Sequence, residues 1–90
     1  MAGIPTLVHH ANGNATTTPA EITFAGPSRS ISIQNTATSA ANDLLVSFDG
    51  GSTYKTLKRL AAIGIVVRVG SIWVKSSAGS VAYEALVTHD

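Results

Sequence analysis

The chain has 90 residues and no cysteine, and only 12% of its residues are charged, with a net charge of +1. Without cysteine, disulfides and thiolate metal sites are excluded, and this net charge is too small for the basic field that nucleic-acid binding requires. No segment approaches the roughly 20 consecutive apolar residues of a membrane span. The N-terminal residues lack the basic and apolar regions of a secretion signal, so we expect that the protein is made in a cytoplasm and either stays there or leaves by a route other than secretion, and we expect no membrane partner.

The first third of the chain predicts short strands separated by a turn. Residues 4–9 form an apolar run, and Asn12 and Gly13 follow it. This dipeptide is typical of a type I′ turn, because both central residues of that turn need positive φ. A second run at residues 21–24 has its two large apolar side chains on one face. The segment therefore predicts two strands joined through a turn near Asn12.

The next segment alternates between apolar and polar residues. Residues 29–35 place Ile31 and Ile33 on one face and serines on the other, which is the period of a half-buried strand. Residues 36–42 consist of Ala, Thr, Ser and one Asn and show no hydrophobic periodicity, so we predict a loop there.

The clearest hairpin of the sequence joins strands at residues 44–48 and 53–57. Gly50 and Gly51 lie between them and supply the left-handed backbone that a tight reversal needs. Residues 57–62 have some helical character but are too few for a stable helix, so we predict a loop or a single turn there.

Three further strands are predicted in the last third, at residues 63–69, 72–75 and 81–88. The first and last of these also carry apolar residues on their outward faces, Val66 and Leu86. A small two-layer sandwich has only one dry face per sheet. The outward apolar residues therefore indicate burial against a partner protein.

About seven or eight mostly antiparallel strands are the number found in sandwiches and jelly rolls. We therefore predict an all-β fold, a small antiparallel β-sandwich of jelly-roll type, in a single domain. Residues 28–90 are expected to form its core, and residues 1–27 an arm or first strands that dock on a neighbour. A domain this small buries only about 60% of the surface of its unfolded chain, and scaffolds of this size usually need a disulfide, a metal or oligomerisation. We expect a homo-oligomer.

Residues for catalysis or metal binding are too few to support an enzyme. His9 and His10 are adjacent, so in a strand they point to opposite faces and cannot bind one metal ion, and His89 is far along the chain. The loop at Asp49 offers one carboxylate, whereas Ca²⁺ needs several oxygen ligands. No Gly-x-Ser-x-Gly sequence marks a nucleophilic serine. We predict no catalytic residue, no metal and no cofactor.

Six residues are predicted to lie at interfaces with other subunits: Val66, Arg68, Trp73, Leu86, Lys58 and Arg59. Two of them are the outward apolar residues, and the single tryptophan joins them because aromatic side chains dominate both cores and interfaces. The lysine and arginine at positions 58 and 59 belong to the one basic cluster, which fits an interface rim or a solvated loop. The arginine at position 68 lies between two valines and is placed for an ion pair between subunits.

Residues 47–57 (Ser-Phe-Asp-Gly-Gly-Ser-Thr-Tyr-Lys-Thr-Leu) and 70–76 (Gly-Ser-Ile-Trp-Val-Lys-Ser) resemble small virion proteins of tailed bacteriophages. The similar stretch extends from about Ile31 to Thr88. The resemblance implies a non-enzymatic subunit of a virion, a capsid decoration or cement protein that binds its own copies and the major capsid protein. A neck, collar or baseplate component of the tail is the alternative.

Two hypotheses from other classes stay open. Trp73 with Tyr54 or Tyr83 suggests a stacking platform for sugars, as in a carbohydrate-binding module for host-surface glycans. The second is a metal-dependent hydrolase, which has the least support because metal-binding residues are scarce.

Overall fold

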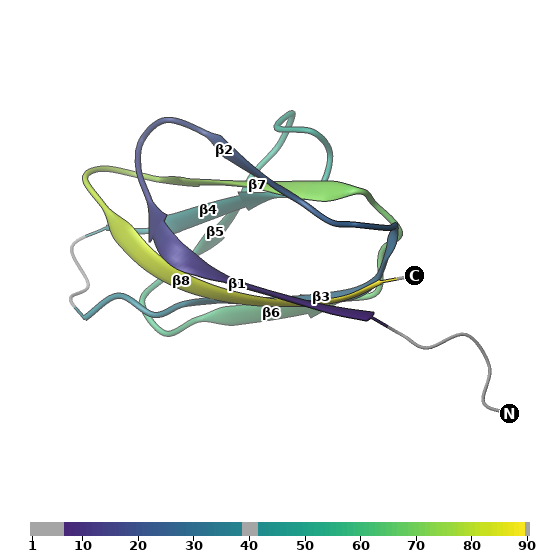
Figure 1. Cartoon of the computed structure of the whole chain (residues 1–90). Coiled ribbons are helices and arrows are strands. Elements are labelled where there is room, and N and C mark those ends of the chain that lie inside the picture. Colours follow the sequence, from purple (N-terminus) through teal and green to yellow (C-terminus); the bar gives the residue numbers. More distant parts are fainter. Residues whose placement is uncertain (1–6, 39–41, 90) are drawn as a thin grey trace, which may run out of the picture.

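The computed structural model describes residues 7–38 and 42–89, which form eight β-strands and no helix. The strands are β1 (Leu7–Ala15), β2 (Ala20–Thr23), β3 (Ser28–Asn35), β4 (Leu44–Ser47), β5 (Lys55–Leu57), β6 (Ala62–Ile65), β7 (Ser71–Ser76) and β8 (Val81–His89). They form two four-stranded antiparallel sheets that pack face to face (Figure 1). This confirms the predicted all-β sandwich. Among the described residues, no helix is long and apolar enough to span a membrane.

The strand order is that of a jelly roll. Sheet A has the order β1-β8-β3-β6, and sheet B has the order β2-β7-β4-β5. The first strand pairs with the last, the second with the seventh, the third with the sixth and the fourth with the fifth. The chain is therefore one long antiparallel hairpin whose two arms are rolled together into two sheets, which is the jelly-roll arrangement.

The side chains between the two sheets form one hydrophobic core. Burial alternates along each long strand: Ile31 and Ile33 of β3 are buried while Ser32 between them is exposed, and in β8 the buried Val87 follows the exposed Leu86. The buried apolar residues are Ala15, Phe24, Ile31, Ile33, Leu44, Val46, Leu57, Ile72, Val74, Val81, Ala85 and Val87. The period-2 pattern of the sequence thus predicted correctly the buried face of β3 and the outward direction of Val66 and Leu86.

The predicted turn at Asn12 and Gly13 is wrong. Both residues lie inside β1, which pairs without interruption with β8 from Leu7 opposite His89 to Ala15 opposite Val81. Gly13 lies opposite Tyr83, and a Cβ atom at Gly13 would lie 3.7 Å from the Tyr83 hydroxyl. Pairing with the long β8 therefore overrides the local turn preference of the dipeptide.

Two predicted segments fall partly outside the described residues. Of the predicted strand at residues 4–9, the described part begins at Leu7 and belongs to β1. Of the predicted loop at residues 36–42, residues 36–38 and 42 are described and lie outside the strands.

The strand predicted at residues 63–69 loses its regular pairing after Ile65. At the same end of β3, the register of its pairing with β8 shifts between Ser28 and Ser30. The Ser28 hydroxyl donates a hydrogen bond to the carbonyl of Val67 and accepts one from the amide of Val69 at 2.9 Å. The Ser28 amide also donates to the carbonyl of Val69, at 2.8 Å. Ser28 thus holds the segment beyond the end of β6 through its side chain and its backbone, and the predicted alternation of burial continues to residue 69.

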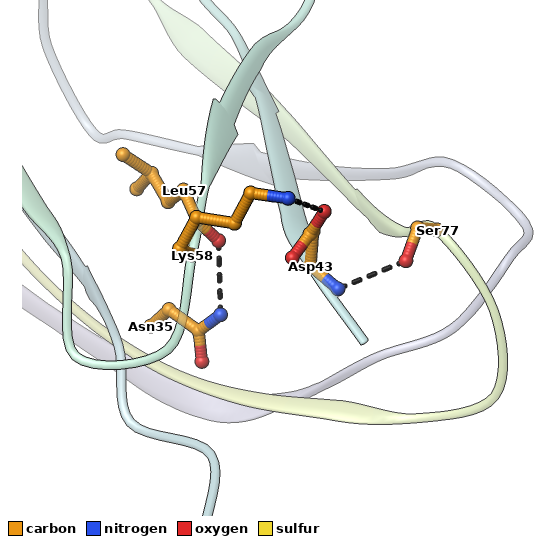
Figure 2. A network of polar contacts seen from close by, with 5 residues as sticks. All are labelled: Asn35, Asp43, Leu57, Lys58 and Ser77. Atoms are coloured by element: carbon orange, nitrogen blue, oxygen red, sulfur yellow. Dashed lines mark hydrogen bonds and ion pairs between the residues drawn. The ribbon is translucent and has the colours of Figure 1, made fainter. Parts of the chain in front are cut away.

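A buried asparagine joins the two sheets at one end of the sandwich (Figure 2). Asn35, the last residue of β3 in sheet A, is fully buried, and its amide nitrogen donates to the carbonyl of Leu57 at the end of β5 in sheet B, at 3.0 Å. Its side-chain oxygen accepts from the amide of Ala37 at 3.0 Å. One side chain therefore satisfies two backbone groups that strand pairing does not reach.

A second set of polar contacts holds the ends of three strands of sheet B together (Figure 2). Asp43 precedes β4, and its carboxylate pairs with the Lys58 ammonium beyond β5 at 2.8 Å. The Asp43 amide donates to the Ser77 hydroxyl beyond β7 at 2.9 Å. Because Lys58 is well exposed, its ion pair adds little to stability, roughly 0–1 kcal/mol.

The carboxylate of Asp49 organises the predicted hairpin between β4 and β5. It accepts hydrogen bonds from the amide of Thr53 at 2.9 Å, from the Thr53 hydroxyl, and from the Ser47 hydroxyl at 2.7 Å. Gly50 and Gly51 have positive φ angles of 76° and 89°, as the sequence predicted for this turn. The hydrogen bonds from Thr53, followed by that from Ser47, lower the pKa of Asp49 from 3.8 to about 2.

Replacement of Asn35 by Ala should lower the free energy of unfolding by about 2–4 kcal/mol. The change leaves the Leu57 carbonyl and the Ala37 amide without partners, and each buried unsatisfied group costs about 1–3 kcal/mol. Chemical denaturation measures the difference. Ser32→Ala on the exposed face of the same strand is the control and should change stability by less than about 0.5 kcal/mol. Equal effects of the two substitutions would contradict the role given to Asn35.

Asp49→Asn should reduce the loss of stability of the protein in acid. Because the folded pKa of Asp49 lies below its ordinary value, the carboxylate stabilises the fold above pH 3.8, and this contribution is lost as the pH falls to about 2. Melting temperatures should therefore fall more steeply between pH 4 and 2 in the wild type than in the variant. Parallel curves over this range would show that the carboxylate does not hold the hairpin.

Candidate interaction surface

The outward-facing residues of sheet A form one of the two broad faces of the sandwich. Along the sheet, His10 of β1 lies opposite Leu86 of β8, which lies opposite Ser32 of β3, which lies opposite Gly64 of β6. Side chains of opposite residues in antiparallel strands share a face. We call this row and its neighbours on the same side the outer face of sheet A. Leu86, near its centre, is 43% exposed.

Three apolar side chains stand out on the outer face of sheet A. Besides Leu86, Val8 in β1 is 50% exposed and Val66, directly after β6, is 87% exposed. The neighbouring residues of each chain segment face the core, so these three side chains point away from the core. A branched apolar side chain that stays in water forgoes about 1.5–3 kcal/mol of burial energy, which a partner surface would recover.

Small residues between these side chains leave two hollows on the same face. One, of about 370 Å³, lies over β1, β8 and β3 and is lined in part by the polar side chains of His10, Asn12, Gln34 and Glu84. The other, of about 290 Å³, lies over β8, β3 and β6 and includes Gly64 and Val66. Ser32 and Leu86 border both hollows. The face is therefore uneven, with Leu86 as a projection between two depressions.

The linings of the two hollows hold almost no charge. Among the residues that line the two hollows, Glu84 is the one carboxylate, and none is lysine or arginine. Charged residues are depleted at the centres of protein interfaces, and apolar residues are enriched there. The composition of the outer face of sheet A thus fits contact with protein better than contact with nucleic acid.

The six residues that the sequence pointed to are spread over the molecule. Val66 and Leu86 lie on the outer face of sheet A. Lys58 and Arg59 lie in the turn between β5 and β6, where Lys58 pairs with Asp43 and the Arg59 side chain donates to the carbonyl of Ala37 at 3.1 Å. Arg68 is exposed in the segment after β6. These residues therefore do not form one cluster.

Trp73 lies on the opposite side of the sandwich, on the outward face of sheet B. It lies opposite Glu21 of β2 and Ser47 of β4, and it is half-buried. Tyr54 precedes β5 on the same sheet, and the Lys75 ammonium lies 4.3 Å from the centre of its ring. One face of the Tyr54 ring is therefore covered by a cation, which leaves less of it available for stacking on a sugar.

Tyr83 belongs to a different surface from Trp73. It lies in β8 opposite Gly13 and Asn35, on the side of sheet A that faces the core, and it packs against the core residues. Burial raises the pKa of its hydroxyl. Of the two tyrosines considered as partners of Trp73, Tyr54 thus shares a sheet with it and Tyr83 does not.

The histidines do not converge on a common point. His9 packs against the buried Phe24 with a distance of 6.0 Å between ring centres, whereas His10 is exposed, so the two side chains point in opposite directions as expected. His89 is buried in β8. Within residues 7–38 and 42–89, no three His, Asp or Glu side chains are grouped so that they could hold a metal ion.

Comparison of the chain with protein-family models, with curated proteins and with solved structures gave no match.

Two exposed apolar residues were missed by the sequence reasoning. Val8 lies in the apolar run at residues 4–9, whose pattern favours neither face, and its outward direction follows from the register with β8. Leu60, which is 54% exposed, has a positive φ of 65° in the turn before β6. A leucine that follows Lys58 and Arg59 directly, in a segment too short for a helix, was the available signal for an exposed turn.

Proposed function

We propose that this chain is a non-enzymatic structural subunit of a tailed-bacteriophage virion, which decorates and cements the capsid shell by contact with the major capsid protein and with its own copies. The observation that carries the proposal is the charge-poor outer face of sheet A, with Val8, Val66 and Leu86 exposed around shallow hollows. The resemblance of residues 31–88 to small virion proteins of tailed bacteriophages is the reason for proposing a virion as the assembly that the chain joins. Jelly rolls occur in viral capsid proteins and also in lectins, so the fold is compatible with this role but does not select it.

Attachment would depend on apolar contact area repeated by symmetry. Buried apolar surface contributes about 25 cal/mol per Å², from which the costs of association are subtracted. A single copy of this small face therefore gives a weak contact. Many copies bound to a symmetric shell raise the effective affinity, because each bound copy holds the neighbouring binding partners close together.

Two alternative functions use one side of the sandwich each. A subunit of the neck, collar or baseplate would use the outer face of sheet A in the same way on a different ring of proteins. A glycan-binding module would use the other side of the molecule, where Trp73 and Tyr54 belong to one sheet, and is favoured by that juxtaposition alone. The cation over Tyr54 weighs against it.

Leu86→Lys should reduce binding of the chain to virions at least about tenfold, because a charge then replaces the apolar projection and must be desolvated at the contact. Virions of the encoding phage that lack the gene product are mixed with purified chain, and the bound fraction is measured by sedimentation. Thermal melts establish that the variant folds.

Thr56→Lys is the matched control, since Thr56 is an exposed residue of β5 on sheet B. It should bind like the wild type. Equal binding by the Leu86→Lys variant would contradict the assigned surface, and absence of wild-type binding to capsid and tail alike would contradict the proposed function. Binding to glycan arrays that is lost in Trp73→Ala would favour the carbohydrate-binding alternative instead.

A further inference from the structure

β6 is an edge strand with one open side. It pairs with β3 on one side only, through Ile31 opposite Ile65 and Ile33 opposite Ile63, and it is the last strand of sheet A. The amide of Asn35 donates to the carbonyl of Ala61 at 3.0 Å, so the backbone of residue 61 faces β3. Backbone groups of a strand point to its two sides in alternation. The peptide groups of Ala62 and Gly64 therefore face away from β3.

β6 is short, with four residues, but its open side lacks two other features that usually prevent strand edges from pairing, namely charged residues and proline. Residues 60–67 read Leu-Ala-Ala-Ile-Gly-Ile-Val-Val, with no charged residue and no proline. Natural edge strands are commonly protected by lysine, proline, bulges or short length. Within this segment Leu60 and Val66 are strongly exposed, at 54% and 87%. An aliphatic edge of this kind is a template for another strand.

The other three edge strands differ from β6 in this respect. β2 contains Glu21 and is preceded by Pro19, and β5 has three residues, the first of which is Lys55. β1 is long, but its sequence is dominated by histidine, asparagine and glycine, and the last two are depleted in strands. The β6 edge is therefore the one best suited to pairing among the described strands.

We infer that β6 pairs in antiparallel fashion with β6 of a second copy of this chain, across a two-fold axis at Gly64, and so joins the two sheets A into one continuous sheet. A second copy is the fitting occupant because a two-fold contact sets each residue against a symmetry-related residue of the same short segment. Here the segment is free of charge, so no like charges oppose each other. The inference rests on the proposed function for its use in a particle.

The side chains select this register over its neighbours. With the axis at Gly64, the exposed Val66 lies opposite the small Ala62 of the other copy, and Gly64 lies opposite Gly64. An axis at Ile63 would instead set Val66 against Leu60, whose positive φ of 65° places it in the turn before β6 and not in extended backbone. An axis at Ile65 would set Ala62 against Arg68, which lies beyond the end of β6.

The absence of cysteine from the chain permits a direct test by single-cysteine variants. A Cβ atom at Gly64 meets no atom within 4 Å, so Gly64→Cys introduces a thiol without a clash. Under mild oxidation Gly64→Cys should form a covalent dimer at least about tenfold faster than Ser32→Cys, because a disulfide requires Cα atoms about 4.4–6.8 Å apart. Ser32 is exposed on the same face but one strand in from the edge.

Two further variants test the register. Ala62→Cys and Val66→Cys should each dimerise slowly alone, whereas their mixture should form a disulfide quickly, since these positions face each other only across the axis at Gly64. Equal rates for Gly64→Cys and Ser32→Cys, or fast dimers of Ala62→Cys alone, would overturn the inference. If Gly64→Cys fails to dimerise while the wild type still binds virions, the inference falls and the proposed function stands. If Gly64→Cys dimerises quickly but the wild type does not bind virions, the inferred β6 contact stands and the proposed function falls.

Discussion

The structure depends on one constraint: a sandwich of two four-stranded sheets has a single core, and each strand can give only every second residue to it. In β8 the inward positions are taken by residues such as Val87 and Ala85, so Leu86 must face outward. The same register that buries Ile63 and Ile65 against the core turns Val66 to solvent. The exposed apolar side chains of Leu86 and Val66 on the outer face of sheet A are thus a direct consequence of how the core is filled.

Polar side chains define the ends of the sandwich, where the strand ladders stop. Asn35 connects the end of β3 to the end of β5, and Ser28 at the other end of β3 connects to the segment after β6. Asp49 closes the hairpin between β4 and β5. The contacts of Asn35 and Ser28 satisfy backbone groups that would otherwise be buried without partners. A domain built in this way has its specificity at its ends and its contact area on its faces.

The sequence was sufficient for the fold class because its alternation is strong, as in Ile31-Ser32-Ile33 and Val81 to Val87. It was sufficient for the outward direction of Val66 and Leu86 for the same reason. It misled at Asn12 and Gly13, where the long pairing with β8 outweighs a local turn preference. It also misled after Ile65, where the regular pairing with β3 ends and Ser28 holds the segment through its hydroxyl and its amide. The hollows beside Leu86 and the open edge of β6 depend on which strands are neighbours, and a single sequence does not contain that order.

The central claim is that the outer face of sheet A is covered by protein in the working state of the molecule. Hydroxyl-radical footprinting with mass spectrometry tests it directly, on the dilute isolated chain and on the chain bound to virions. Labelling of Leu86 and Val66 should fall strongly on binding, while labelling of Trp73 on sheet B should stay nearly constant. Unchanged labelling of Leu86 with protection of Trp73 would contradict the account and assign the contact to the opposite side of the sandwich.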